Sequence, residues 1–383
     1  MAACTLFFMM CPAAGNAQQL AFPGAEGAGR FSAGGRGGIT VRVTNLNDDG
    51  PGSLRAAVRA KQPRIVVFDV AGTIRLKSDL VIEQPRITID GASAPAAGIA
   101  IADHGLVVKA DDVVIRYFRS RLGDKGGGEG DAIWIARGRR IILDHVSASW
   151  SVDETLSASA RYEDGGIYDL TVQWSIIGES LRRAGHAKGE HGYGSLIRGG
   201  RGARFSFHHN LWAHHVARMP RPGNYASAAV DLIGPLIEFR SNVFYNWGGS
   251  ASGYNADTAS NATYAFIDNA YVSGPDSKGQ LAFREENALA KAWFSGNSMN
   301  AMVPADPWSL VTGKGVRLAA APDIALVNAD RAASAYARVL ADAGASKVRD
   351  SVDKRIVASV AARTGGIIDS QDQVGGWPDL TAK

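Results

Sequence analysis

Short runs of hydrophobic residues recur along the middle of the chain, bounded by glycine, asparagine or aspartate. Runs of this length with turn residues on both sides are typical of β-strands, and no amphipathic helix lies between them. We therefore predict a mainly β protein. The predicted strands are residues 87–90, 113–117, 141–145, 170–174, 204–208, 236–240, 263–267 and 291–295.

Asparagine follows four of these runs at the same offset. Asn210, Asn242, Asn269 and Asn297 are separated by 32, 27 and 28 residues. A period of roughly 30 residues indicates a solenoid, in which each repeat buries its apolar face against its neighbours. An antiparallel sandwich requires no such period. We therefore predict an all-β, right-handed parallel β-helix in which the asparagine amides hydrogen-bond from coil to coil.

Helices are predicted near both ends of the solenoid. Residues 51–59 form an amphipathic pattern with Ser53 as N-cap, and this helix is expected to cover the N-terminal coil. Residues 329–343 and 351–362 have helix-forming composition and are expected to pack across the later coils. No linker divides the chain, so residues 18–383 are predicted to form a single domain.

The first residues are typical of an export signal. An apolar run over residues 5–10 precedes small residues that end at Ala17, which predicts a signal peptide over 1–17 and secretion to the periplasm or outside the cell. Both cysteines, Cys4 and Cys11, lie in this segment, so the mature chain would contain no disulfide. No run approaches the ~20 apolar residues that span a bilayer, which excludes an integral membrane protein.

Composition narrows the range of partners. The 383 residues are 46% hydrophobic and 20% charged, as in a folded globular chain. Lysine and arginine number 41 against 37 acidic residues, and the pI is about 9.0. A mild basic excess suits a polyanion, but it does not distinguish nucleic acid from an acidic polysaccharide.

Acidic residues cluster in two neighbouring repeats. Glu129 and Asp131 lie two positions apart, and Asp153 and Glu154 follow roughly one coil later. Stacked coils lie about 5 Å apart, so these carboxylates would repel one another. Ca²⁺, which binds oxygen ligands, would relieve that repulsion. Solvated turn carboxylates are the alternative interpretation.

Basic residues cluster in two further segments. Lys188 lies in a glycine-rich stretch over 185–194, and Arg218 and Arg221 lie beside two prolines that prevent regular strand pairing. Paired arginines suit carboxylate or phosphate recognition, although structural arginines are the alternative. Seven of the eight histidines lie between His145 and His215. Adjacent histidines on a strand face opposite ways, so packed structural histidines are favoured over a zinc site.

Several motifs together resemble the pectate lyase family of polysaccharide lyases. They are Ala-Phe-Pro-Gly-Ala-Glu-Gly at 21–27, Val-Val-Phe-Asp-Val-Ala-Gly-Thr-Ile at 66–74, Ile-Thr-Ile-Asp-Gly at 87–91, Leu-Asp-His-Val-Ser at 143–147, Ala-Arg-Met-Pro-Arg at 217–221 and Ile-Ile-Asp-Ser at 367–370. The resemblance implies a right-handed parallel β-helix, secretion, bound Ca²⁺ and β-elimination of polygalacturonate, which leaves 4,5-unsaturated ends.

The resemblance also implies a calcium site. Asp131 matches the family's calcium aspartate, and Asp153 matches the first carboxylate of its calcium pair. The second carboxylate of that pair falls on Ser157 in this chain, which departs from the family's pattern. Glu154 or Glu129 is expected to replace it, or the substrate brings the metal.

Basic site residues are implied in the same way. Arg218 matches the family's catalytic arginine. A further substrate-binding arginine of the family falls on Gly223, and Arg221 is the expected replacement. Lys188 resembles the substrate-binding lysine.

Two other functions are compatible with the same residues. A glycoside hydrolase of the polygalacturonase type would use two carboxylates that flank the scissile bond, without calcium. A non-catalytic polysaccharide-binding β-helix would use only the basic segment. Only a lyase creates a UV-absorbing unsaturated sugar. In each case the expected partner is an acidic polysaccharide and neither nucleic acid nor a membrane, and the protein is expected to be a monomer.

Overall fold

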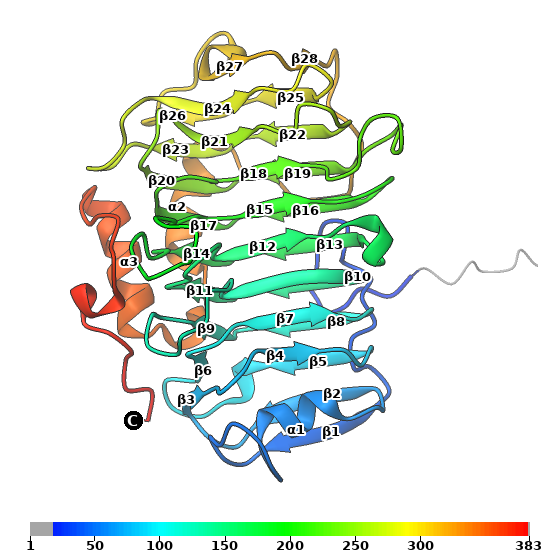
Figure 1. Ribbon diagram of the computed structural model, residues 1–383, viewed down its shortest axis with the longest axis vertical. Helices are drawn as coiled ribbons and strands as arrows, with labels where there is room; N and C mark the ends of the chain where they lie inside the picture. The colour runs from blue at the N-terminus through cyan, green and yellow to red at the C-terminus, as the bar shows by residue number, and fades with distance from the viewer. Residues whose placement is uncertain (1–17, 382–383) are drawn as a thin grey trace, which may run out of the picture.

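A computed structural model describes residues 18–381, which wind into a parallel β-helix (Figure 1). The predicted signal segment, residues 1–17, lies outside the described residues. All the paired strands of successive coils run parallel, as the repeat predicts. The strands form three faces, which we call A, B and C.

Face A holds the predicted strands in consecutive coils, so that part of the prediction is confirmed. Its strands are β1 (Ile39–Val43), β2 (Arg64–Phe68), β5 (Ile87–Asp90), β8 (Val113–Arg116), the second half of β10 (Ile133–Asp144), β13 (Ile167–Gln173), β16 (Arg204–His208), β19 (Leu236–Arg240), β22 (Thr263–Ile267), β25 (Lys291–Ser295) and β28 (Val316–Arg317).

Faces B and C are built from shorter strands. Face B contains β3 (Gly72–Arg75), β6 (Ile99–Ala102), β9 (Arg119–Arg121), β11 (Ser147–Ser149), β14 (Ile176–Gly178), β17 (Leu211–His215), β20 (Val243–Trp247), β23 (Ala270–Val272) and β26 (Ser298–Met299). Face C contains β4 (Leu80–Ile82), β7 (Leu106–Lys109), the first half of β10, β12 (Leu156–Ser159), β15 (Leu196–Arg198), β18 (Arg221–Gly223), β21 (Ala251–Asn255), β24 (Leu281–Glu285) and β27 (Val311–Gly313).

Stacked side chains fill the inside of the coils. Phe207, Phe239, Phe266 and Phe294 lie on successive strands of face A, with ring centroids 5.5, 4.8 and 4.7 Å apart. All four rings are buried. Each inward position therefore packs on its own copy in the next coil, which is why a single repeat could not fold alone.

The predicted asparagine ladder is present at the bend between faces A and B. The amide nitrogen of Asn210 donates to Asn242 at 3.1 Å, that of Asn242 to Asn269 at 3.0 Å, and that of Asn269 to Asn297 at 2.8 Å. The residue before each rung has a positive φ, for example 56° at Ser241, which turns the chain sharply. The ladder satisfies the buried backbone of that turn.

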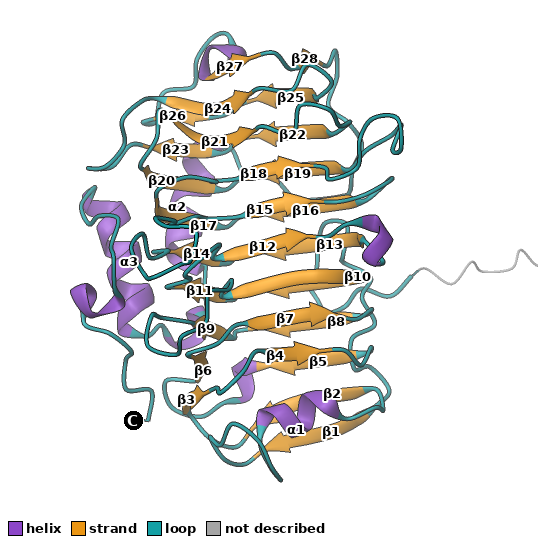
Figure 2. Cartoon of the chain, viewed as in Figure 1, coloured by secondary structure: helices purple, strands orange, loops and turns teal. Residues whose placement is uncertain are grey.

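The helices cover one end and one side of the solenoid (Figure 2). Helix α1 (Leu54–Arg59) buries Leu54 and Val58 against the first coils, and the Ser53 hydroxyl accepts a hydrogen bond from the Ala56 amide at 3.1 Å, as predicted. Helices α2 (Ala332–Asp342) and α3 (Ser351–Ala362) pack on face B.

The expectation that both C-terminal helices cover later coils is wrong for α3. Arg121 on β9 is fully buried and forms hydrogen bonds with Asp350 and Asp353 at 2.8–3.0 Å, which fixes α3 against earlier coils. A buried guanidinium requires such partners. Within residues 18–381, no helix combines the length and hydrophobicity needed to cross a membrane.

Candidate active site

The acidic and basic residues singled out in the sequence meet on the outer surface of face C. Glu154, Tyr193 and Ala217 form successive parallel bridges, and Asp131 lies two residues before β10 just as Glu154 lies two before β12. Since Ile133 pairs with Leu156, Asp131 and Glu154 are aligned in neighbouring coils. Stacking therefore brings together residues that are far apart in the sequence.

Three carboxylates form a cluster at the edge of this surface. Oxygens of Asp131, Asp153 and Glu154 all lie within 4.8 Å of one another, and the Glu154 amide donates to Asp131 at 3.1 Å. Burial raises the pKa of Asp131 well above its ordinary value, and the charge of Asp153 raises it further, whereas the Ser157 hydroxyl and Arg218 lower it. This repulsion is of the kind that a cation relieves.

A hard divalent cation fits this donor set, because it consists only of carboxylate oxygens. Asp131 and Asp153 both belong to the cluster, as the resemblance implied. The hydroxyl of Ser157, the position at which a carboxylate was expected from the resemblance, forms a hydrogen bond with Asp131. Glu129 is exposed and is not a member of the cluster.

Arg218 lies beside the cluster in a constrained conformation. Its φ of 62° is left-handed, and its guanidinium lies 3.8 Å from the centroid of the Tyr193 ring. The guanidinium forms an ion pair with Glu154, and the two side chains are only 16% and 5% exposed. Among the described residues, the Arg218 Nε has no hydrogen-bond partner. One donor of Arg218 is therefore buried without a partner in this structure.

Arg221 is held loosely. Its Nη2 lies 3.5 Å from Asp257, which makes two shorter hydrogen bonds to Arg198 at 2.6 and 2.7 Å. A Cβ on Gly223 would meet the Asp257 carboxylate at 2.0 Å. The departure at Gly223 therefore has a steric reason, because a side chain there would displace Asp257.

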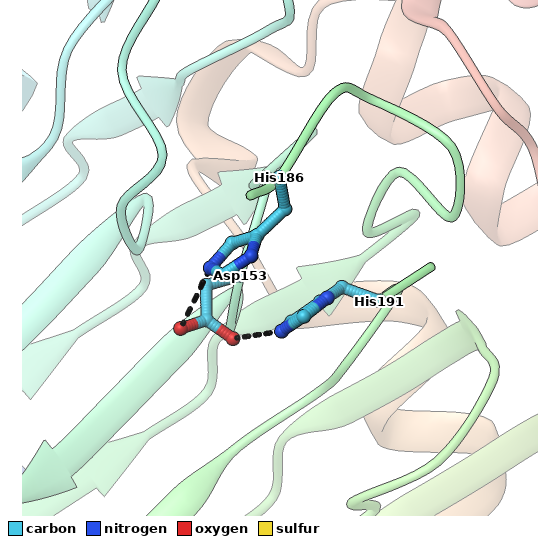
Figure 3. A group of neighbouring side chains, drawn as sticks. All are labelled: Asp153, His186 and His191. Carbon is cyan, nitrogen blue, oxygen red and sulfur yellow. Dashed lines mark ion pairs between the residues drawn. The ribbon is translucent and has the colours of Figure 1, made fainter. Parts of the chain in front are cut away.

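Two histidines of the glycine-rich loop point at Asp153 (Figure 3). His186 Nε2 lies 3.8 Å from one carboxylate oxygen and His191 Nε2 lies 3.6 Å from the other. Their rings stack with centroids 3.7 Å apart. In the same loop the Lys188 side chain is exposed, and its backbone amide donates to His186 at 3.0 Å. The loop therefore covers one side of Asp153.

Sequence reasoning missed three neighbours of the cluster. His186 and His191 belong to the histidines predicted to be packed structural residues, and Tyr193 was given no role. The two histidines five residues apart in a glycine-rich loop were the available signal, whereas nothing in the sequence shows that Tyr193 supports Arg218.

A hollow of about 280 Å³ opens over the acidic cluster and gives a ligand access to it. Its lining includes the three clustered carboxylates, Ser157, Trp134 and Tyr225. An oxygen-donor cluster that opens into such a hollow is suited to binding an anion through a shared cation.

Comparison with known proteins identifies the class and the family. The chain is 38% identical over 374 residues to a probable pectate lyase C of Aspergillus fumigatus, covering 93% of this chain and 81% of the relative. It is also 38% identical to the corresponding Aspergillus terreus protein, covering 94% and 82% of the two chains. No protein-family model matches the sequence.

Solved structures show the same fold. The major cedar pollen allergen jun a 1 superposes with a TM-score of 0.61 at 15% identity, covering 84% of this chain and 92% of that one. A pectate lyase from Bacillus sp. N165, in complex with trigalacturonate, gives a TM-score of 0.58 at 13% identity, covering 84% and 99%. Fold and relatives together define a polysaccharide lyase built on a parallel β-helix. The chain belongs to the pectate lyase family.

Proposed function

We propose that this protein is secreted and cleaves polygalacturonate by calcium-assisted β-elimination, leaving 4,5-unsaturated oligogalacturonides. The observation that carries the proposal is the contact between the acidic cluster and Arg218, since Glu154 belongs to the cluster and pairs with that arginine. The names of the relatives, and the trigalacturonate bound by the Bacillus protein, support this substrate class.

Asp131 and Asp153, with Glu154 as a third ligand, would hold Ca²⁺. When bound, the ion neutralises the negative charge that develops on the uronate carboxyl group as the α-proton leaves. Ser157 is placed to support Asp131 by a hydrogen bond. Glu129, which lies outside the cluster, would not be a ligand in this arrangement.

Arg218 would first lose a proton to solvent and then, as a neutral base, accept the C5 proton. The C5–H electrons form the C4=C5 double bond as the C4–O bond breaks, and the departing oxygen takes a proton from water. Glu154 would have to leave its ion pair with Arg218 before this step so that the guanidinium can meet the substrate, while the Tyr193 ring would stay against it.

Arg221 and Lys188 would bind uronate carboxylates. Arg221 has a long contact to Asp257 and a buried Nε without a hydrogen-bond partner among the described residues, so it can reorient toward an anion. Lys188 lies on the exposed loop that covers Asp153. The two cations would thus approach the polymer from separate segments.

Ultraviolet absorbance of the unsaturated product, together with a count of new reducing ends, tests this function. With polygalacturonate and added calcium, both signals should rise in parallel for the native chain. Arg218→Ala should lower the rate by roughly 10²–10⁴-fold, the usual contribution of a positioned base. New reducing ends without absorbance would show hydrolysis and refute the lyase proposal.

A further inference from the structure

Two imidazole rings and one carboxylate converge at the edge of the candidate active site (Figure 3). His186 and His191 direct their Nε2 atoms at separate oxygens of Asp153, at 3.8 and 3.6 Å. One ligand atom from each of the three side chains lies within 4.8 Å of the other two. Both distances exceed the length of a hydrogen bond, so the two rings approach the carboxylate without bonding to it.

The space between these atoms has the size of a small divalent ion. Zn²⁺ binds histidine nitrogen and carboxylate oxygen at about 2.0–2.2 Å, so two of its tetrahedral ligands lie about 3.4 Å apart. The separations of 3.6 and 3.8 Å in this structure are slightly longer. A small inward movement of the loop therefore brings the three side chains to coordination distance.

The two imidazoles are shielded from bulk water, yet an ion can reach them from the active site. The side chains of His186 and His191 are only 7% and 9% exposed. Asp153 lines the hollow of about 280 Å³, which provides an entry path. Glu190, which precedes His191, pairs with Arg183 at 2.7 Å, so this carboxylate of the loop is already engaged.

The hydrogen bonds of the Nδ1 atoms bear on whether each Nε2 can bind a metal. A metal-bound imidazole carries its proton on the other ring nitrogen and donates it to an acceptor. His191 satisfies this condition, because its Nδ1 lies 2.9 Å from the Gly189 carbonyl oxygen. On His186 the Nδ1 accepts from the Lys188 amide at 3.0 Å, and this bond has to open. Lys188 is exposed, so water can replace the imidazole as acceptor.

This donor set differs from that of the acidic cluster. Ca²⁺ prefers oxygen ligands alone, whereas imidazole nitrogen suits zinc and related transition metals. The two histidines lie five positions apart on a loop, so the alternation that separates adjacent histidines on a strand does not apply. We propose that His186, His191 and Asp153 form a second metal site, which binds Zn²⁺ or a similar transition-metal ion with water as the fourth ligand.

Asp153 links this site to the acidic cluster, because it belongs to both groups of ligands. Two divalent ions that share one carboxylate repel each other. Zn²⁺ at the histidines therefore weakens Ca²⁺ binding at the cluster, and Ca²⁺ weakens Zn²⁺ binding by the same factor. This competition rests on the proposed function, whereas the histidine site itself does not.

Isothermal titration calorimetry with ZnCl₂ tests the site, on the full chain without a polyhistidine tag and without polymer. The native chain, freed of metal by a chelator, should bind Zn²⁺. His186→Gln and His191→Gln should each weaken this binding by at least ~100-fold, since losing only an outer-shell partner of a ligand costs about 10–100-fold. His104→Gln is the matched control and should bind Zn²⁺ normally, because His104 lies 3.8 Å from Asp79 but belongs to neither ligand group.

No Zn²⁺ binding by the native chain, or the same affinity in the native chain and both histidine variants, would overturn the site. Equal unfolding temperatures of the metal-free proteins show that the variants still fold. In excess Ca²⁺, Zn²⁺ binding to the native chain should weaken at least ~5-fold, the lower end of a typical coupling between sites. An unchanged Zn²⁺ affinity would overturn the competition for Asp153.

Ultraviolet absorbance with polygalacturonate separates this inference from the proposed function. If the native chain forms no unsaturated product but both histidine variants lose Zn²⁺ binding, the metal site stands and the lyase proposal fails. If unsaturated product forms but the native chain binds no Zn²⁺, the metal site fails and the lyase proposal stands.

Discussion

Glu154 has two incompatible tasks at the level of single residues. It belongs to the carboxylate cluster and also pairs with Arg218. The Glu154 side chain is only 5% exposed, so its carboxylate is buried in both interactions. Under the proposed function, Glu154 would have to leave Arg218 before the guanidinium could meet the substrate.

Removing Arg218 should cost stability as well as activity, because Glu154 would stay buried without its partner. We expect Arg218→Ala to lower the free energy of unfolding by about 1–3 kcal/mol in urea denaturation without calcium. The double variant Arg218→Ala with Glu154→Gln removes the charge and should recover most of that loss. Equal stability of Arg218→Ala and the native chain would show that the pair does not form in solution.

Buried histidines should make the fold sensitive to acid. Burial lowers the pKa of His215 to about 4, while its ring accepts from or donates to Ser180 at 2.6 Å and contacts the Ile177 carbonyl at 2.9 Å. The unfolded chain binds this proton near pH 6.5. The contribution of neutral His215 to the free energy of unfolding is therefore fully present above pH 6.5 and is lost as the pH falls toward 4.

Comparing the native chain with His215→Gln isolates this effect from other histidines whose pKa is also lowered, such as His209. Between pH 7 and pH 5, the native chain should lose about 2 kcal/mol of unfolding free energy more than the variant. If urea denaturation showed that the native chain and His215→Gln lose the same unfolding free energy between pH 7 and pH 5, a neutral, buried His215 would be contradicted.

At this scale the sequence predicted which residues meet, but not how they pair. Asp131, Asp153 and Arg218 could be brought together because they lie at corresponding ends of stacked strands. The choice of Glu154 as partner of Arg218 depends on side-chain rotamers. The approach of His186 to Asp153 depends on an irregular loop that no periodicity describes.

Among the elements, the asparagine ladder is the clearest link between sequence period and stability. The Asn242 amide donates to the Phe207 carbonyl at 2.8 Å and to Asn269 at 3.0 Å, and its oxygen accepts from Asn210. Every polar atom of this side chain is therefore used inside the coil stack.

Replacing an asparagine in the middle of the ladder should lower the free energy of unfolding more than replacing the asparagine at its end. Asn242→Ala would leave buried groups unpaired in two neighbouring coils, so the unfolding free energy should fall by about 3 kcal/mol. Asn297→Ala is the matched control, because Asn297 ends the ladder and should cost roughly half as much. Equal costs, measured by thermal or urea unfolding, would show that the rungs act independently.

Strands on face A could be predicted because they are long and bounded by turn residues. The short strands of face C escaped prediction, since three residues such as Arg221–Gly223 carry no readable alternation, and Pro222 argues against a strand. The position of α3 also escaped prediction, because it depends on contacts between Arg121 and Asp350, which are 229 positions apart in the sequence.

In the whole molecule, the parallel β-helix brings residues that recur along the sequence side by side on one long outer surface, face C. Each coil contributes only a few exposed residues on face C, and stacking aligns them along the axis of the solenoid (Figure 1). The carboxylate cluster and the hollow above it lie on this surface. A rigid surface of this shape suits a long polymer better than a small molecule.

Calcium dependence of product formation tests the central claim most directly. The rate of unsaturated product formation from polygalacturonate should vanish in excess chelator and return with added Ca²⁺. Asp153→Asn should require a higher calcium concentration for half the maximal rate, whereas Asp323→Asn, a change outside the cluster, should not. Undiminished turnover in excess chelator, or an unshifted calcium response in Asp153→Asn, would contradict a cation held by these stacked carboxylates beside Arg218.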